Sequence, residues 1–367
     1  MSGVRHLYVH LPFCAHRCGY CDFVTAVGSL HRHGPYVDGL LAELELERGL
    51  LAVELDTVFL GGGTPTFTQP EVLSRLLAAL PPAGEVTVEA NPETVTPALA
   101  ALLREGGVNR VSLGAQSFQP ELLGILERVA GPDDVRRAVH TLRDAGFDNI
   151  SLDLIYGIPG QGATDLERDL AEALALEPEH LSCYELEAKP GTRFTHAHGE
   201  ELVRQAAAME GYFERVVETL TGAGYRWYET ANFCRRDPGR DLRAQHNLGY
   251  WHGRDYLGLG VGAVSTVRGR RWRTTPSVGR YLAALGEARR PARDVEELER
   301  ATRQAERVLL GLRLDEPLSL DGLGDAVDAA GLERVERLGL AVREADTVVL
   351  TPLGRLLGGG VTVEVLA

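Results

Sequence analysis

Short apolar runs alternate with amphipathic segments through the first half of the chain, and this alternation constrains the fold most. Six runs have the character of strands: residues 7–13, 57–60, 86–90, 110–114, 150–156 and 181–186. Five stretches between them have the character of helices: residues 36–51, 70–80, 97–105, 133–145 and 164–176. Strands that alternate with helices form a parallel sheet with the helices outside it. An α/β fold is therefore predicted, either an open doubly wound sheet or an incomplete parallel (β/α)6 barrel.

Polar residues stand where the predicted strands end, and their placement favours the barrel. A cysteine-rich loop follows the first strand, a Gly-Gly-Gly-Thr run follows the second, and Glu89 ends the third. Gln116 comes just after the fourth strand, and Asp153 lies within the fifth. Any one of these residues is compatible with an ordinary turn or cap. As a series they indicate one site, because the carboxyl ends of barrel strands converge on one mouth.

Helix-end signals support the same segmentation. Pro70 and Pro97 occupy first-turn positions of their helices, with Thr68 and Thr96 before them as predicted N-caps. Gly146 follows its helix in the way that C-terminal glycines do. These residues predict where three of the helices begin or end.

The βα pattern stops near residue 190, and no further βα unit is predicted after it. We expect three parts: a partial barrel over residues 1–190, an α+β extension over 191–293, and a small helical or winged-helix-like domain over 294–367. The extension has a helix-like stretch at 200–221, followed by an apolar run at 227–233. The last part is expected to begin with a helix at 297–310 and to end with a strand that leads into a short helix at 347–357.

Three cysteines, Cys14, Cys18 and Cys21, lie on one short loop after the first predicted strand. Thiolates are the ligands of iron–sulfur clusters, and three closely spaced ones suit a [4Fe-4S] cluster with one iron left open to a small molecule. The alternative is a zinc site, which needs a fourth ligand, with His10 or His16 nearest. A disulfide framework is disfavoured because the chain has an odd number of cysteines, 5.

Charge and hydropathy exclude some partners. The net charge of −14 disfavours wholesale binding to a nucleic-acid backbone. The apolar stretch at 7–13 is too short for a signal-peptide core or a membrane span. We therefore expect a cytoplasmic protein, in a compartment reducing enough to preserve an exposed cluster, with no nucleic-acid partner.

The motifs as a set resemble one family within the radical S-adenosylmethionine (SAM) superfamily. The Cys-x-x-x-Cys-x-x-Cys loop resembles the cluster loop of that superfamily. Gly61-Gly62-Gly63-Thr64 resembles its glycine motif, although a glycine run alone is also typical of a tight turn. The further motifs are Glu89-Ala-Asn-Pro-Glu, Gly114-Ala-Gln-Ser and Asp153-Leu-Ile-Tyr-Gly-Ile-Pro-Gly-Gln. Together they resemble the family of the oxygen-independent coproporphyrinogen III oxidases and their heme-chaperone relatives.

The resemblance implies a cluster site and a SAM site. Cys14, Cys18 and Cys21 would hold the [4Fe-4S] cluster. The residues implied to line the SAM pocket are Tyr8, Gly62, Gly63, Thr64, Glu89, Gln116, Arg128 and Asp153, with Ala263 and Val264 at the adenine. These types suit the ligand, since carboxylates accept from ribose hydroxyls and arginine pairs with a carboxylate. Arg128 is also compatible with an exposed helix surface, and the run Gly160-Gln161-Gly162-Ala163 departs from the family, which usually has threonine right after Gln161.

Two positions favour the heme-chaperone side of the family. The oxidases have a further cysteine two positions beyond the third ligand, where this chain has Phe23. His246-Asn-Leu-Gly-Tyr-Trp matches the His-Asn-x-x-Tyr-Trp motif of the chaperones, and histidine is a ready axial ligand for heme iron. Without the family context, such a histidine is more often a packed polar residue.

The resemblance therefore implies a protein that binds heme and delivers it to acceptor hemoproteins, respiratory enzymes among them. We expect no catalytic residue and no active coproporphyrinogen III dehydrogenase. The alternative is a radical SAM enzyme that decarboxylates coproporphyrinogen III in porphyrin biosynthesis.

Arginines gather on both sides of the His246 motif. They are Arg235, Arg236, Arg240 and Arg243 before it, and Arg268, Arg270, Arg271 and Arg273 after it. Arginine pairs well with carboxylates, and heme carries two propionates. A solvated loop, an anionic membrane surface or an acidic partner accounts for the same arginines. Peripheral membrane contact and a homodimer are further expectations.

Overall fold

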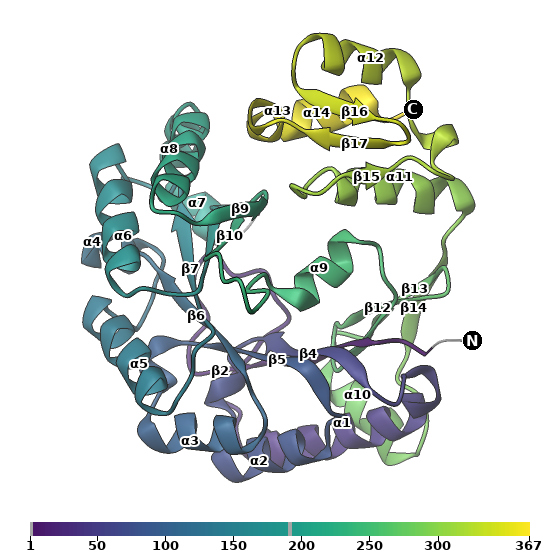
Figure 1. The fold of residues 1–367 in the computed structure, drawn as a ribbon. Helices are drawn as coiled ribbons and strands as arrows, with labels where there is room; N and C mark the ends of the chain where they lie inside the picture. The colour runs from purple at the N-terminus through teal and green to yellow at the C-terminus, as the bar shows by residue number, and fades with distance from the viewer. Residues whose placement is uncertain (1–2, 190–192) are drawn as a thin grey trace.

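The computed structural model describes residues 3–189 and 193–367, and its centre is a parallel sheet curved into an incomplete barrel (Figure 1). The barrel strands, in sheet order, are β1 (His6–Leu11), β4 (Leu55–Gly62), β5 (Ala83–Ala90), β6 (Arg110–Gln116), β7 (Ile150–Tyr156) and β8 (His180–Glu185). The helices outside them are α1 (His33–Glu47), α2 (Pro70–Ala79), α3 (Pro97–Glu105), α4 (Pro120–Ile125), α5 (Pro132–Asp144) and α6 (Ala163–Ala175). The predicted strands and helices are confirmed, and the incomplete barrel is the architecture. In the described ranges, no helix is both long and apolar enough to span a bilayer.

Alternation along β1 shows how the sequence builds the two faces of this sheet. Leu7 and Val9 are fully buried and belong to the main core, which includes apolar residues of the outer helices. Tyr8 lies between them and therefore points to the opposite face, into the barrel. It pairs in register with Phe59 of β4, and the two rings stack with centroids 6.1 Å apart. The outer face thus carries the core, and the inner face is left for a site.

The sheet continues beyond both edges of the barrel. β11 (Tyr256–Leu259), a strand that was not predicted, pairs in parallel with β1 after the short helix α9 (Gln245–Trp251), which lies inside the curve of the sheet rather than outside it (Figure 1). Leu257 and Leu259 of β11 are buried in the core, and Gly258 between them has no room for a side chain: a Cβ there would lie 2.2 Å from the Val264 carbonyl oxygen. The remaining strands are antiparallel: β12 (Val264–Val267), β13 (Arg270–Thr274) and β14 (Arg293–Glu297) beyond β11, and β10 (Asn232–Cys234) and β9 (Arg226–Glu229) beyond β8.

The helix-like stretch at 200–221 is two helices, α7 (Arg193–Ala206) and α8 (Met209–Gly222). Gln205 Nε2 and Tyr212 Oη both donate to the Gln161 carbonyl oxygen, at 2.9 and 2.7 Å. In one continuous helix, residues seven positions apart are separated by about 10 Å along the axis. The break between α7 and α8 brings both side chains to one acceptor.

Four of the five predicted helix-end residues are confirmed, since Pro70 and Pro97 are the first residues of α2 and α3, and one is wrong. Thr96 is the N-cap of α3 and accepts from Leu99 N at 3.2 Å, and Gly146 has φ +84°. Thr68 does not cap α2, because Pro70 is its first residue and the N-cap position falls on Gln69. A capping side chain must stand directly before the first turn to reach its free N–H groups.

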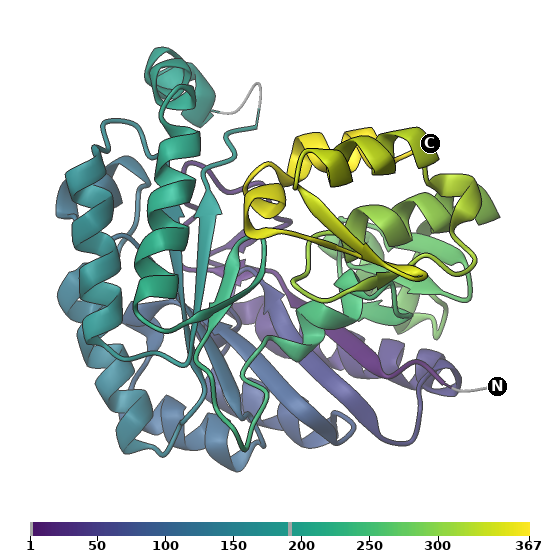
Figure 2. The same cartoon turned by 45° about the horizontal axis from the view of Figure 1, so that its top comes forward.

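A C-terminal module lies beside the barrel opening (Figure 2). It comprises α11 (Arg300–Gly311), β15 (Leu318–Ser319), α12 (Ala329–Arg337), β16 (Ala341–Glu344), β17 (Thr347–Leu350), α13 (Pro352–Leu356) and α14 (Gly358–Val365), and α10 (Val278–Gly286) precedes it against α1. The module has its own apolar core and a three-stranded antiparallel sheet, which matches the winged-helix-like expectation. Its first helix begins at Arg300 rather than at residue 297, and residue 294 falls in β14 of the main sheet. The predicted boundary at 190–191 lies outside the described residues, and the three-part division stays a prediction.

Ion pairs join this module to the far edge of the barrel. Arg226 of β9 binds both oxygens of Asp315 at 2.8 Å, just after α11. Arg313 donates to the fully buried Glu229 at 2.7 Å, and Glu229 also forms a β-bridge with Leu314. The segment after α11 therefore joins the C-terminal module to the β9 edge of the sheet through charged contacts.

Candidate cofactor site

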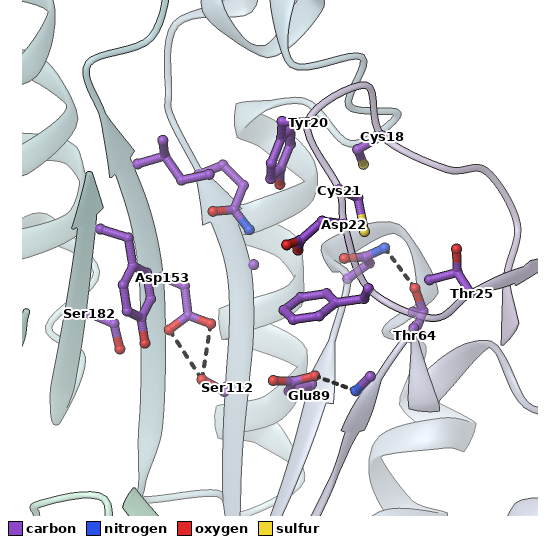
Figure 3. Close-up of a pocket in the computed structure, with 18 of the residues that line it drawn as sticks. Cys18, Tyr20, Cys21, Asp22, Thr25, Thr64, Glu89, Ser112, Asp153 and Ser182 are labelled. Carbon is purple, nitrogen blue, oxygen red and sulfur yellow. Dashed lines mark hydrogen bonds between the residues drawn. The ribbon is translucent and has the colours of Figure 1, made fainter. Parts of the chain in front are cut away.

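A cavity of about 640 Å³ lies at the carboxyl ends of the barrel strands. Figure 3 shows side chains from the cysteine loop and from successive strands pointing into it. The predicted residues that line it are Tyr8, Cys14, Cys18, Cys21, Gly62, Gly63, Thr64, Glu89, Gln116, Arg128, Asp153 and His246. Ala263 and Val264 line a neighbouring cavity instead. The structure thus brings together the predicted cluster and SAM residues, with the adenine contacts set apart.

The cysteine loop is closed at its base by two short strands. β2 (Phe13–Cys14) pairs with β3 (Ala26–Val27) in a separate two-stranded sheet, so the two ends of the loop between them are held together. Cys14 Sγ accepts from Thr64 Oγ1 and Cys18 Sγ accepts from Arg128 Nη1, both at 3.5 Å. Burial raises the pKa of the Cys14 thiol, and the bond from Thr64 opposes this effect. Such donors stabilise thiolates, which are the form that binds iron.

The two histidines considered for a zinc site have other partners. His10 Nε2 is hydrogen-bonded to the Val24 carbonyl oxygen at 2.8 Å, and His10 Nδ1 to Tyr8 Oη at 3.0 Å. His16 Nε2 lies 3.8 Å from Glu127 Oε2. Over residues 3–189 and 193–367, no three His, Cys, Asp or Glu side chains surround a position for a single metal ion. These residues therefore assemble no zinc site in this structure.

The glycine motif is held against the start of the cysteine loop by its backbone. Gly63 N donates to the Leu11 carbonyl and Thr64 N to the Phe13 carbonyl, each at 2.8 Å. Gly62 has φ +112°, and a Cβ there would lie 2.5 Å from the His10 ring. Only glycine fits this conformation and this approach. The motif is more than a tight turn, because it fixes the loop beside the cavity.

Two partly buried carboxyl groups face the cavity from neighbouring parts of the sheet (Figure 3). Glu89 accepts from Gly62 N at 3.0 Å, and burial raises its pKa to about 7. Asp153 accepts from Ser112 Oγ at 3.0 Å, and burial raises its pKa as well. Both groups can accept from hydroxyl donors of a ligand.

Arg110, which the sequence reasoning missed, supplies the counter-charge. It is 2% exposed at the start of β6, lines the cavity, and lowers the pKa of both Glu89 and Asp153 through its charge. Its Nε has no hydrogen-bond partner among the described residues. The sequence signal that could have identified Arg110 is its position as a charged residue at the start of a mostly apolar strand.

Gln116 and Arg128 also line the cavity. Gln116 has φ +65°, unusual for a residue with a side chain, and the pairing of β6 with β7 shifts register there. Arg128 Nη2 donates to Asn91 Oδ1 and to the Gly114 carbonyl, both at 2.9 Å. Arg128 therefore lines the cavity, and the alternative that it lies on an exposed helix surface is wrong.

His246 lies on α9, which sits inside the curve of the sheet (Figure 1). It is 1% exposed and stacks on Phe59 with ring centroids 5.1 Å apart. Nδ1 is hydrogen-bonded to Thr57 Oγ1 at 2.7 Å, and Nε2 to Tyr250 Oη at 2.8 Å. Burial lowers the pKa of His246 to about 3, so the ring is neutral at neutral pH. Both nitrogens are thus engaged within the protein.

Comparison with known proteins agrees with the family that the motifs indicate. Residues 8–173 match the family model of the radical SAM superfamily. The chain is similar to the heme chaperone HemW of Mycobacterium tuberculosis, at 38% identity over 97% of this chain and 93% of that protein. It is similar to HemW of Bacillus subtilis, at 34% identity over 98% of both chains, and of Escherichia coli, at 38% over 75% and 76%. The solved structure of the Escherichia coli radical SAM enzyme coproporphyrinogen III oxidase (HemN) has the same fold, with TM-score 0.80, 23% identity, and coverage of 99% of this chain and 90% of that one.

Proposed function

Since the chain belongs to the HemW family of heme chaperones, within the radical SAM superfamily, we propose that it binds heme and delivers it to acceptor hemoproteins. The observation that carries this function is the 38% identity with a HemW that extends over 97% of the chain. Phe23, which stands at the fourth cysteine position of the oxidases, agrees with it.

The residues present fit the cofactors of the superfamily. Cys14, Cys18 and Cys21 are free thiols that line one cavity, and we assign them to a [4Fe-4S] cluster. The cluster supplies one-electron reduction and an open iron for the methionine part of SAM. Arg128 suits the SAM carboxylate, since it is a cation fixed beside Cys18, and Glu89 and Asp153 suit hydroxyl donors. The individual SAM contacts, Ala263 and Val264 among them, remain proposals.

Heme coordination by His246 is also a proposal, and the structure sets a condition for it. Because Thr57 and Tyr250 hold both ring nitrogens, iron has to replace one of these bonds. The ring is already neutral, which is the form that binds iron. Heme binding at His246 therefore requires a local movement of α9 or of Tyr250.

Heme titration of the protein with its cluster reconstituted under anaerobic conditions tests the function. We expect a Soret band that saturates with the wild type, and an affinity about tenfold lower for His246→Ala, which is about 1.4 kcal/mol. His180→Ala is the matched control: His180 is fully buried and bridges Ser151 Oγ and Tyr228 Oη, both at 2.8 Å. The control is expected to lose similar stability and keep its heme affinity.

The outcomes separate two claims. A wild type that binds no heme, or that cannot pass heme to an apo-hemoprotein, contradicts the proposed function. Equal losses for His246→Ala and His180→Ala contradict only the role of His246. Decarboxylation of coproporphyrinogen III with release of 5′-deoxyadenosine in anaerobic turnover would favour the alternative enzyme.

We also propose specific acceptor proteins, a membrane contact, an assembly state and a location in the cell. They are respiratory enzymes as acceptors, peripheral membrane contact, a homodimeric state and a cytoplasmic location. The support is the family resemblance together with the need of an exposed cluster for a reducing compartment. Sedimentation and vesicle flotation of the reconstituted protein test the dimer and the membrane contact.

A further inference from the structure

A second cavity, of about 1250 Å³, lies beside the cofactor cavity. Its walls come from β11–β13, the end of the cysteine loop, the end of α9, and α11 of the C-terminal module. The residues that it shares with the cofactor cavity are Tyr8, Asp22, Phe23 and Tyr250. Ligand cavities commonly measure about 300–1,000 Å³, so this space accommodates a molecule as large as a tetrapyrrole.

The walls of this cavity are strongly basic. Six arginines line it against three acidic residues, in a protein whose net charge is −14. Arg271 is already paired with Glu306 at 2.7 Å, and Arg307 donates to the His252 carbonyl. The other four, Arg254, Arg268, Arg273 and Arg303, are exposed, and within the described ranges none of their guanidinium groups has a hydrogen-bond or ion-pair partner.

Some of the arginines around the His246 motif are paired with acidic residues, and others are not. Arg240 binds Asp148 at 2.7 Å and Arg243 binds Asp241 at 2.6 Å, both before the His246 motif. After the motif, Arg270 pairs with Glu297 at 3.0 Å. Arg268 and Arg273 keep free guanidinium groups, and both line the second cavity. Arg236 has no partner among the described residues either, but it lies outside both cavities, so the second cavity is where two of these free arginines line one space.

Apolar side chains in the same cavity complement the arginines. Phe23 is 60% exposed and Leu309 is 44% exposed, and both line it. The rings of Tyr250 and Tyr256 meet edge to face with centroids 4.6 Å apart. Large apolar side chains exposed in a hollow surface indicate a binding site for an apolar molecule.

We propose that the second cavity is the heme-docking site, with the porphyrin against Phe23 and Leu309 and the propionates bound by Arg268 and Arg303. This inference rests on the proposed function. Arg303 Nη1 lies 3.4 Å from where a Cβ on Gly269 would stand, so Arg268 and Arg303 flank one turn and suit two neighbouring carboxylates. SAM carries a net positive charge, and the arginines disfavour it here; because Ala263 and Val264 line this same cavity, heme at this site takes the place of the adenine contact proposed for them. His246 lines the cofactor cavity, so the iron of a heme docked here reaches its Nε2 only when Tyr250, which stands in the shared wall and is bonded to that nitrogen, moves aside.

Titration with heme and with its uncharged dimethyl ester tests the site. The wild type is expected to bind heme about tenfold more tightly than the ester. The double variant R268N/R303A should lose this preference while its affinity for the ester stays unchanged; asparagine is chosen because residue 268 has φ +54°. The matched control is R236A/R280A, two exposed arginines outside both cavities, which should behave as the wild type. Cluster absorbance and SAM binding check that the fold is intact.

Each result bears on one claim. A double variant that binds heme as the wild type does, or a wild type that does not distinguish heme from its ester, overturns the docking site and leaves the proposed function standing. A double variant that loses SAM binding and keeps heme binding also overturns it, since the cavity would then serve SAM. Failure of the wild type to bind either porphyrin overturns the proposed function itself.

Discussion

Among single residues, Glu89 shows how the cavity changes a group that the sequence identifies. Burial raises its pKa from 4.5 to about 7, so the folded chain keeps a proton that the unfolded chain has lost. The free energy of unfolding therefore falls as the pH rises from about 4.5 to about 7, and it stays lower above this range. A shift of this size corresponds to about 2 kcal/mol after allowance for water in the cavity.

Glu89→Gln removes this decrease, because glutamine keeps an acceptor for Gly62 N and cannot ionise. We expect the variant to be more stable than the wild type by about 2 kcal/mol at pH 8, and by much less at pH 5. Urea unfolding at the two pH values, without SAM, measures the difference. Glu71→Gln, at an exposed position of α2, is the control and should show no such pH dependence. An equal gain at both pH values would contradict the assignment.

The sequence identifies ligand residues more readily than the residues that support them. Cys14 and Glu89 belong to short motifs whose spacing is visible without a structure. Arg110 lies 21 positions from Glu89 and 43 from Asp153 and belongs to no motif; its function depends on the barrel bringing it close to these two carboxyl groups. For the same reason the sequence could not show that both nitrogens of His246 are engaged.

Among the elements, α9 is held at its start by a single carboxylate. Gln245 N and His246 N each donate to a different oxygen of Glu85 on β5, at 3.1 Å. These N–H groups belong to the first turn and have no partner within the helix. Glu85 therefore fixes the start of the helix that carries His246.

Glu85→Ala is expected to loosen α9 and to lower the free energy of unfolding by about 2 kcal/mol, since two buried N–H groups lose their acceptor. Glu85→Gln keeps one acceptor oxygen and should cost about half as much. Hydrogen exchange over residues 245–251 reports the loosening directly. Unchanged exchange in Glu85→Ala would show that the barrel walls, rather than this cap, hold the helix.

Regular elements are predictable where one physical signal dominates. The strand at 150–156 has the predicted bounds, since it is a nearly continuous apolar run between polar turns. β13 and β14 carry arginines and glutamates on exposed positions, and they are strands because β13 pairs with both β12 and β14. The division of residues 193–222 into α7 and α8 depends on a distant acceptor, Gln161, which no local pattern reveals.

In the whole molecule, the barrel edge and the C-terminal module are joined by the pair of Arg313 and Glu229. Glu229 is fully buried, so Arg313→Ala leaves a carboxylate without its cation. We expect a loss of about 2 kcal/mol in the free energy of unfolding, less than for a fully enclosed pair because the Arg313 side chain is 36% exposed.

Urea unfolding followed by tryptophan fluorescence checks this expectation. Arg334→Ala is the matched control, since Arg334 pairs with Glu364 at the surface within the module and should cost less than about 1 kcal/mol. Equal losses in the two variants would mean that the Arg313 pair contributes no more than a surface pair.

Tyr8, Phe23 and Tyr250 belong to the walls of both cavities, so any shift of these rings changes both volumes at once. With heme in one cavity and SAM in the other, the two ligands are thermodynamically linked through that partition. Linkage is reciprocal: the factor by which SAM alters heme affinity is the factor by which heme alters SAM affinity. Bound SAM would then set the affinity with which the protein holds heme, and its dissociation would change that affinity by the same factor.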